Sequence, residues 1–526
     1  MEWKAAQKGY PHSTTAPAGV GYRNRGLPEI QVNDRQLSHI SAECLDALED
    51  SNDPPRLFAR AGEMAAVSGD EHGETRIISV SQDLVRGELT RCANFYLVTP
   101  KGQSNAFPPN DAVKDLLARP TDELPFPPLI GLSGMPILHT DGTVTEPGYD
   151  PVTKMIYSPA PGLVVPPIPD SPTQSDFRHA ADVATEVIEE FPWTDPASFT
   201  NTLGLLLTMV VRPVIAGAVP IAVLDAPMPG TGKSLIAEMT AIIGTGSVAA
   251  MQPAPTDEAE WKKLITSVVC SGRQLLVIDN LEHVLESSSL CAAATAESWS
   301  DRILGRTEVV KLPQRVQFVC TGNNIVLGGD LPRRCYWVRI DAQTSRPWTG
   351  RDFRHKRLKQ YVSQNRGTLV AALLTMAAAW FRAGQPEGDS PKPGSFEEWA
   401  RIIGGIICFA GYGGFLANST ELYGKLNPAE SDWYGFLRAL HGVFGGAGRY
   451  FTVREIIPRL LSGPLADAAP EEIQTIMGDL RIREKGRAVG RALRRNVDRR
   501  YGSEGFHLVQ DGVLDGVAKW VIRRSN

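Results

Sequence analysis

Eight residues between an apolar run and a helical pattern carry the clearest chemistry in this sequence. The run "PIAVLDA" is bounded by turn residues and is typical of a buried parallel strand, whereas "SLIAEMTAII" has apolar residues at helical spacing. Between them lies "PMPGTGKS", residues 227–234. Its glycines let backbone N–H groups turn inward, and these groups form a phosphate cradle together with the helix N-terminus. The pattern therefore indicates a nucleoside triphosphate site.

The side chains of this loop have separate expected roles. Lys233 can reach the β- and γ-phosphates, and the Ser234 hydroxyl can ligate Mg²⁺. Pro227 stands where the usual pattern has glycine. We expect ATP and Mg²⁺ as cofactors, and the predicted nucleotide-binding residues are Pro227, Met228, Pro229, Gly230, Thr231, Gly232, Lys233 and Ser234.

A carboxylate follows the next strongly apolar run, "QLLVIDNLEHV". Asp279 ends this run one or two strand–helix units after Lys233, where P-loop ATPases hold Mg²⁺. Many such enzymes place Glu directly after the aspartate, but here the position is Asn280. An amide can orient a water molecule but cannot accept its proton, so Glu282 is the nearest candidate for a base. The identity of the general base stays open.

Two further polar clusters adjoin apolar strands. "VQFVCTGNN" ends in amides, and an Asn there can contact the γ-phosphate or the attacking water; the same residues also make a good turn. "GGDLPRRCYWVRI" places Arg333 and Arg334 just before another strand. Paired arginines can meet surface acids, or they can reach a neighbouring subunit's ATP and stabilise charge in phosphoryl transfer.

The order of these parts resembles a family. "PMPGTGKS", "LLVIDN", "SWSDRILG", "CTGNN" and "DLPRRC" follow one another between Pro227 and Cys335 as in the AAA+ ATPases. The resemblance is to replicative helicases related to the superfamily 3 and minichromosome-maintenance groups, in particular helicase-like ATPases of bacterial phages, plasmids and integrated elements. It implies that Asn323 is the sensor and that Arg333 or Arg334 is a trans-acting finger. It also implies a ring, with a hexamer as the expected state.

The segment 300–316, "SDRILGRTEVVKLPQRV", lies between the Mg²⁺ strand and the sensor strand. "RILGRTEVVKL" predicts two short strands about a Gly-Arg-Thr turn, that is, a β-hairpin. Helicases of the resembled groups carry a hairpin near this point that projects basic residues into the central channel. Arg306 and Lys311 are the candidate DNA-binding residues, although a charged hairpin is also common as a solvated edge.

The stronger DNA signal lies near the end of the chain. "RIREKGRAVGRALRRNVDRR", residues 481–500, holds nine Lys or Arg against two acids. As a helix it would place apolar residues on one side, and on the other Arg487, Arg491, Arg494 and Arg495. Two short helices precede it, and "RRYGSEGFHLV" and "AKWVIRR" resemble the strands of a wing. We therefore predict a winged helix-turn-helix domain that binds duplex DNA. The alternatives for the basic helix are a solvated face or docking on an acidic partner.

Composition bounds these assignments. The chain has 526 residues and a formal net charge of -5, so it needs several domains and a local patch to meet nucleic acid. Seven scattered cysteines form no CxxC pair, which favours a reducing, cytoplasmic setting. The apolar run 203–224 contains Arg212-Pro213, so we expect a buried helix and strand there and no membrane span.

The predicted fold class is an α/β P-loop (AAA+) core with a helical lid, preceded by a β-rich α+β module and followed by the winged helix. The Pro-rich linker "PAPGLVVPPIPDSPT" marks the clearest boundary. The predicted divisions are a tail 1–28, the N-terminal module 29–170, the ATPase core 171–350, the lid 351–430 and the DNA-binding domain 431–526.

These expectations combine into an ATP-dependent DNA helicase or translocase of a mobile genetic element, acting in replication as a ring oligomer. The alternative is an origin-binding initiator or regulatory AAA+ ATPase in which ATP switches assembly without unwinding. A small-molecule kinase that uses the same loop is a third, weaker alternative. The N-terminal module shows no paired-carboxylate primase pattern, so priming would need a separate primase chain.

Overall fold

The computed structural model describes residues 26–69, 75–160, 162–302, 309–347, 353–419, 428–445, 449–479, 481–482, 484–502, 504–514 and 516–524. The chain divides into two compact units. The first comprises Met1–Ser68 and Ile77–Leu129, and the second comprises Gly69–Arg76 and Ile130–Asn526. This division falls about 30 residues before the start of the Pro-rich linker at which the sequence predicts a boundary.

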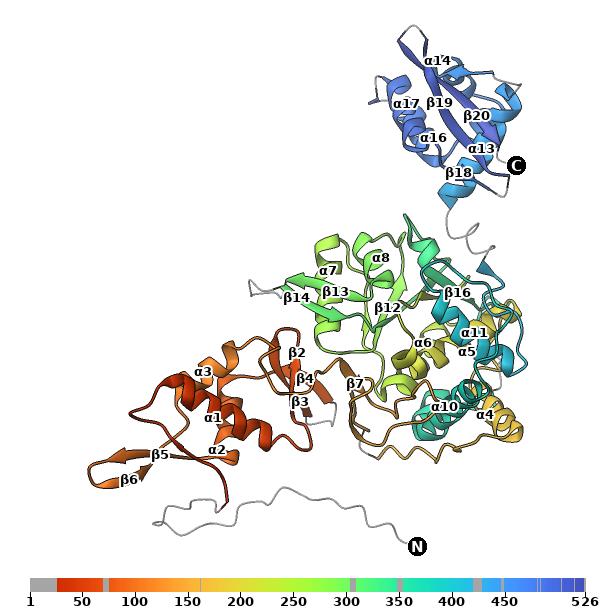
Figure 1. The fold of residues 1–526 in the computed structure, drawn as a ribbon. Helices are drawn as coiled ribbons and strands as arrows, with labels where there is room; N and C mark the ends of the chain where they lie inside the picture. The colour runs from red at the N-terminus through yellow and green to blue at the C-terminus, as the bar shows by residue number, and fades with distance from the viewer. Residues whose placement is uncertain are drawn as a thin grey trace. The chain divides into compact units, whose positions relative to one another are not determined.

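The first unit mixes helices and short strands. Its helices are α1 (Leu37–Asp50), α2 (Gln82–Cys92) and α3 (Asn110–Ala118). Its strands are β1 (Glu29–Gln31), β2 (Leu57–Arg60), β3 (Glu63–Gly69), β4 (Thr75–Ser79), β5 (Asn94–Thr99) and β6 (Gly102–Asn105). The end of β3 and the start of β4 adjoin the division between the two units. They form two three-stranded sheets, β1-β5-β6 and β2-β3-β4 (Figure 1). Leu48, Val85, Leu89 and Leu116 lie in the core of this unit.

The second unit contains a small three-stranded sheet that is hydrogen-bonded to the rest of the unit. Strands β7 (Gly131–Ser133), β8 (Gly148–Asp150) and β9 (Met155–Tyr157) pair in the order β7-β9-β8. The Gln274 side-chain amide donates to the Leu132 carbonyl at 2.7 Å, and the Arg366 guanidinium donates to the Gly134 carbonyl at 3.1 Å. These bonds explain why residues 130–157 group with the following chain and not with the first unit.

A five-stranded parallel sheet forms the centre of the second unit. Its strands are β10 (Ile221–Ala226), β11 (Met251–Gln252), β12 (Leu275–Leu281), β15 (Gln317–Asn323) and β16 (Cys335–Arg339), in the order β11-β12-β15-β10-β16. Every residue of β10 is buried, as expected for a continuous apolar run inside a parallel sheet. The predicted mixed α/β class with a parallel sheet is thus confirmed.

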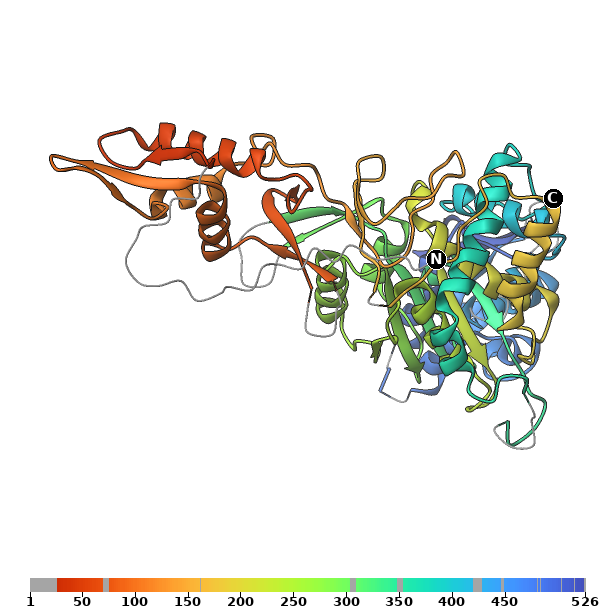
Figure 2. The same cartoon turned by 90° about the horizontal axis from the view of Figure 1, so that it is seen from below.

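Helices flank this sheet. They are α4 (Gln174–Glu186), α5 (Pro196–Val211), η1 (Arg212–Val214), α6 (Lys233–Thr245), α7 (Glu258–Cys270), α8 (Ser288–Thr295), η2 (Leu331–Arg334), α9 (Leu358–Gln364), α10 (Arg366–Arg382) and α11 (Glu397–Phe409). Helices α4 and α10 lie side by side (Figures 1 and 2). The tract that the sequence assigns to a lid shares one hydrophobic core with the sheet, in which Trp380 and Trp399 are fully buried.

The last part of the chain has its own core. It contains α13 (Pro428–Phe444), β17 (Phe451–Thr452), α14 (Val453–Ile456), η3 (Ile457–Leu460), α15 (Pro464–Asp467), α16 (Glu471–Gly478), α17 (Lys485–Arg495), β18 (Arg500–Tyr501), β19 (Phe506–Leu514) and β20 (Val517–Arg524). The strands form an antiparallel sheet in the order β17-β20-β19-β18. Phe436, Leu493 and Trp520 are fully buried among these elements.

The apolar run 203–224 forms most of α5, η1 and the start of β10, as the sequence indicates. Across the described ranges, no helix combines the length and the apolar character that crossing a bilayer requires.

Candidate functional site

The loop between β10 and α6 turns sharply at two glycines. Gly230 and Gly232 have φ angles of 76° and 115°, in the left-handed region that side chains disfavour. At Gly232 an added Cβ would lie 2.9 Å from the ring of Phe191, so both backbone angle and space require glycine there. Helix α6 begins at the next residue, Lys233. The loop therefore delivers the chain directly to a helix N-terminus, where backbone N–H groups attract anions.

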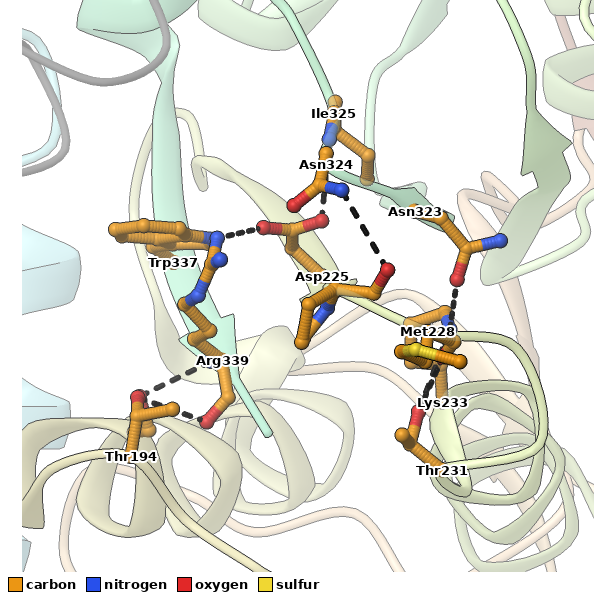
Figure 3. Close-up of polar contacts among 12 residues, drawn as sticks. Thr194, Asp225, Met228, Thr231, Lys233, Asn323, Asn324, Ile325, Trp337 and Arg339 are labelled. Carbon is orange, nitrogen blue, oxygen red and sulfur yellow. Dashed lines mark hydrogen bonds and ion pairs between the residues drawn. The ribbon is translucent and has the colours of Figure 1, made fainter. Parts of the chain in front are cut away.

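Lys233 is 7% exposed and lies against the end of a neighbouring strand. Its Nζ donates to Asn323 Oδ1 at 2.8 Å, to the Met228 carbonyl at 3.3 Å and to Thr231 Oγ1 at 3.4 Å (Figure 3). Burial lowers the pKa of Lys233, and the negative charges of Asp225 and Asp279 oppose that shift. Binding of an anion is electrostatically favourable beside a buried ammonium whose hydrogen-bond acceptors are neutral.

The predicted metal ligands also meet. Ser234 Oγ donates to Asp279 Oδ1 at 3.2 Å, although 45 residues separate them in the chain. Thr321 Oγ1 donates to the same carboxylate oxygen at 2.6 Å and accepts from the Asn280 backbone N–H at 3.2 Å. Sequence reasoning missed Thr321. Its signal was alternation, because residues two apart on a strand share a face, and Thr321 stands two residues before Asn323.

Sheet order explains this convergence. Strand β15 lies between β10 and β12, so its carboxyl end lies between the phosphate-type loop and Asp279. Asn323 pairs in register with Ala226, the last residue of β10. Three segments far apart in sequence therefore place Lys233, Asn323 and Asp279 at one edge of one sheet.

Asn280 and Glu282, the two candidates for handling a water molecule, touch each other. Asn280 Nδ2 donates to Glu282 Oε1 at 2.9 Å. Asn280 has a φ of 57°, and the β12–β15 register shifts between Ile278 and Leu281. The Asn280 side chain is exposed, and its backbone N–H donates to Thr321, which also contacts the Asp279 carboxylate. The amide and the carboxylate thus form a hydrogen-bonded pair beside the predicted metal ligand.

A buried ion pair that the sequence did not single out lies beneath the loop. Asp225 is 1% exposed, and Arg339 Nη1 lies 2.5 Å from its Oδ2 (Figure 3). Burial raises the pKa of Asp225, against the opposing effects of the Ile325 N–H and the Arg339 charge. Arg339 also stacks over the Trp337 ring at 5.0 Å. An aspartate inside an otherwise apolar strand was the available signal.

The structure distinguishes the two predicted arginines. The Arg333 side chain is 76% exposed, and its closest ionic contact is 3.9 Å, to Asp330. Arg334 is 21% exposed and fixed: it pairs with Asp330 at 2.7 Å and donates to the Cys291 carbonyl at 2.9 Å and to Thr295 Oγ1 at 2.5 Å. Arg334 therefore holds η2 on α8, whereas Arg333 projects into solvent.

Helix α8 is in turn bound to α7. The Glu258 carboxylate accepts from the backbone N–H groups of Ser288 and Ser289 at 2.9 and 3.0 Å, at the start of α8. Burial acts to raise the Glu258 pKa, but these bonds together with serine hydroxyls outweigh it and lower the pKa to about 2. A carboxylate at a helix N-terminus is favoured by the exposed N–H groups and the helix dipole.

The predicted hairpin is present as β13 (Ser298–Arg302) paired with β14 (Val309–Pro313). It is fixed to α7, because Asp301 pairs with Lys262 at 2.8 Å and Trp299 Nε1 donates to Thr266 Oγ1 at 2.8 Å. Lys311 is exposed on β14. Arg306 lies outside the described residues.

The basic helix of the last part of the chain is α17. Val489, Ala492 and Leu493 are buried on one side, as the helical pattern predicts. The four arginines on the other side are exposed. Two of them have acidic partners, Arg487 with Glu484 at 2.7 Å and Arg495 with Glu472. Within the described ranges, Arg491 and Arg494 have no ion-pair partner, which leaves two free cations one turn apart.

Comparisons with known proteins give limited information. No protein-family model matches this chain, and no curated protein matches it. Two solved structures described as the A form apo structure of the NrS-1 C-terminal region are similar to it. One has 10% sequence identity, a TM-score of 0.39 and coverage of 89% of this chain and 96% of that chain. The other has 11% identity, a TM-score of 0.38 and coverage of 87% and 96%.

A third solved structure is described as an active helicase, SCCmec type IV Cch. It has 12% identity and a TM-score of 0.31, and the match covers 77% of this chain and 78% of that one. At TM-scores this low, none of these likenesses establishes a shared activity.

Proposed function

We propose that this chain is an ATP-dependent DNA helicase or translocase of a mobile genetic element, built on an AAA+ P-loop ATPase core and acting in DNA replication as a ring, with a hexamer as the expected state. The observation that carries the proposal is the convergence of Lys233, Ser234, Asp279 and Asn323 at one edge of the parallel sheet. The resemblance in motif order points to the same class of enzyme.

The residues present fit ATP and Mg²⁺. A Gly-rich turn before a helix N-terminus and a buried ammonium suit phosphate groups, and a hydroxyl beside a carboxylate suits a hard divalent cation. Lys233 and the 227–232 backbone would bind the phosphates, and Ser234 and Asp279 would hold the metal. Bound together, the two cofactors would supply the phosphoanhydride bond and the divalent charge that polarises it.

The remaining polar groups would orient water and sense the phosphate. Asn323 accepts from Lys233 in this structure, so a phosphate on Lys233 would release the Asn323 amide for a new partner. The Asn280–Glu282 pair offers an amide that orients a water molecule and a carboxylate that accepts its proton. Thr321 would fix the orientation of the Asp279 carboxylate, as outer-shell groups do at metal sites.

The exposure of Arg333 supports its assignment as the residue that reaches a neighbouring subunit's site. A guanidinium supplied in trans stabilises the charge that develops in phosphoryl transfer. Arg334 would act as a positioning residue, because its bonds to α8 fix the short helix that presents Arg333. The contacts of α8 with α7, and of α7 with the β13–β14 hairpin, join this element to the predicted DNA-contacting strands.

DNA would meet the chain at two places. The β13–β14 hairpin would contact the backbone of one strand through Lys311 and Arg306. The domain 431–526 has short helices followed by an antiparallel sheet, which supports a winged helix whose α17 contacts duplex phosphates. Contacts of this kind make binding steeply dependent on salt and give little sequence information.

Asn280 supports a second candidate, a regulatory ATPase or origin-binding initiator that assembles on DNA without unwinding. Strand displacement separates the two functions. For a helicase, unwinding of a forked duplex requires ATP and disappears in Lys233→Ala. ATP-dependent assembly on duplex without strand displacement would support the switch. Absence of ATP hydrolysis and of ATP-dependent assembly would refute both.

A further inference from the structure

Two guanidinium groups converge on one carbonyl oxygen at the end of the sheet opposite the phosphate-type loop. Arg212 Nη1 donates to the Ile215 carbonyl at 3.1 Å, and Arg315 Nη1 donates to the same oxygen at 2.8 Å. Arg212 also donates through Nη2 to the carbonyls of Gly217 and Gln314, each at 3.0 Å. Two positive charges therefore lie close together around shared neutral acceptors.

Neither charge is neutralised by a described side chain. Arg212 is 4% exposed and Arg315 is half-buried. Glu297 favours the charged form of Arg315, yet in the described part of the chain no carboxylate lies within ion-pair distance of either arginine. Burial lowers the pKa of Arg212 to about 9, and the Arg315 charge contributes to that shift. Burial also lowers the pKa of Arg315.

Carbonyl dipoles compensate this charge only in part. Two of the three acceptors of Arg212, the Ile215 and Gly217 carbonyls, lie just after η1, and the third, the Gln314 carbonyl, lies just after β14. All three are neutral dipoles that supply only partial negative charge. Partial charges do not balance two full ones at low dielectric, where like charges repel strongly. In addition, Arg212 Nε is buried and has no hydrogen-bond partner among the described residues.

A small cavity lies at the same place. Its volume is about 30 Å³, which exceeds the 10–15 Å³ or so that one water molecule needs. Arg212 and Arg315 line it, with a third arginine, Arg273, which is exposed. The other walls include apolar residues at the end of β14 and in β7 and β9. Three arginines that have no acidic partner among the described side chains thus line a space of single-ion size.

We propose that this cavity is a binding site for one small inorganic anion of chloride size, held by Arg212 and Arg315 with Arg273 at its mouth. The anion offsets one of the two converging positive charges and accepts from the guanidinium N–H groups that the carbonyls leave without a partner. The site joins η1, the base of the β13–β14 hairpin and the small β7-β9-β8 sheet, so its occupant stabilises their junction. It is independent of nucleotide binding, because the loop at 227–232 lies at the other end of β10.

Thermal unfolding of the full chain tests this site. At fixed ionic strength, replacing gluconate by chloride should raise the unfolding midpoint saturably, by about 2–5 °C at chloride concentrations near a hundred times the dissociation constant. Arg315→Gln should lose this chloride-dependent shift. The exposed Arg178 on α4 gives a matched control, and Arg178→Gln should keep the whole shift. Phosphate as the test anion distinguishes an oxyanion site from a halide site.

A second measurement does not depend on whether the variant folds. Crystals of the wild-type chain soaked in bromide should show an anomalous peak within hydrogen-bond distance of Arg212 and Arg315. Equal midpoints in chloride, phosphate and gluconate, together with no bromide peak at these residues, would overturn the proposal. A chloride-dependent shift of full size in Arg315→Gln would also overturn it, because that result places the ion elsewhere.

Discussion

Replacing Arg333 and replacing Arg334 should have different effects: the first should lower ATP hydrolysis, and the second should lower the stability of the fold. Arg333→Ala removes a side chain that is 76% exposed and whose closest described ionic contact is 3.9 Å long, so it should change folding stability by about 0–1 kcal/mol. A trans-acting arginine contributes about 10³–10⁵-fold to turnover. We therefore expect Arg333→Ala to lose ATP hydrolysis by about that factor with an unchanged unfolding midpoint.

Arg334→Ala should act through stability. Arg334 pairs with Asp330 and donates to a carbonyl and a hydroxyl on α8, and hydrogen bonds from charged donors contribute about 1.5–3 kcal/mol each. Because the side chain is partly exposed, we expect a loss of about 1–3 kcal/mol in total. Arg334→Lys restores the charge but not the fork of donors, so it should recover only part of the stability. Denaturant unfolding and steady-state ATPase assays separate the two classes of effect.

Mixing two inactive variants tests whether Arg333 acts across a subunit boundary. Lys233→Ala removes the central cation of the proposed phosphate site but keeps Arg333, and Arg333→Ala does the reverse. In a randomly mixed ring, about a quarter of the interfaces combine an intact loop with an intact arginine. The equimolar mixture should therefore recover about a quarter of the wild-type turnover per subunit. Hydrolysis at the wild-type rate in Arg333→Ala alone, or no recovery in a mixture shown to co-assemble, would refute the reasoning.

Three further predictions concern other contacts. Thr321→Val removes the hydrogen bond that orients Asp279, so it should lower the apparent affinity for Mg²⁺ in ATP hydrolysis by about 10–100-fold. A magnesium titration at saturating ATP measures this change. The Glu258 pKa is lowered to about 2 from its ordinary value of 4.5, so the stabilising effect of this carboxylate is complete above pH 4.5 and is lost as pH falls toward 2. Glu258→Gln should therefore flatten the loss of stability over this acid range, whereas Glu260→Gln in the same helix turn should not; equal acid profiles would contradict the assignment. Arg491→Gln with Arg494→Gln should lower the slope of log affinity for duplex DNA against log salt by about 1–2, and substituting the two acid-paired arginines of α17 should lower it less.

Local patterns were enough to predict the elements that carry the site. A buried strand, a Gly-rich turn and an amphipathic helix follow one another within 25 residues, so β10, the loop and α6 could be placed from spacing alone. Asp279 and Asn323 were identified because each follows an apolar run. In each case the signal lies within one element and its flanking turn, where sequence and structure are directly linked.

Contacts between elements could not be predicted in the same way. That Lys233 donates to Asn323 depends on β15 lying next to β10, and no local pattern encodes strand order. The Asp225–Arg339 pair has the same origin, since it joins two neighbouring strands that are more than 100 residues apart. The division near residue 129 depends on the bonds of Gln274 and Arg366 to the β7 segment, and a Pro-rich composition cannot report such bonds.

Strand β16 gives a physical reason to treat the arginine pair and the phosphate-type loop as one unit. The strand starts directly after Arg334 and ends at Arg339, whose guanidinium pairs with Asp225 beneath the loop. Five residues at about 3.3 Å each span roughly 17 Å, so one short rigid strand connects the exposed surface at Arg333 to the base of the loop. Asp225 also accepts from the Ile325 N–H, two residues after Asn323. A displacement of the Asn323 segment would therefore act on the same Asp225 carboxylate that pairs with Arg339 at the end of β16. We expect a change at the proposed phosphate site to reach the surface at Arg333 through this shared contact.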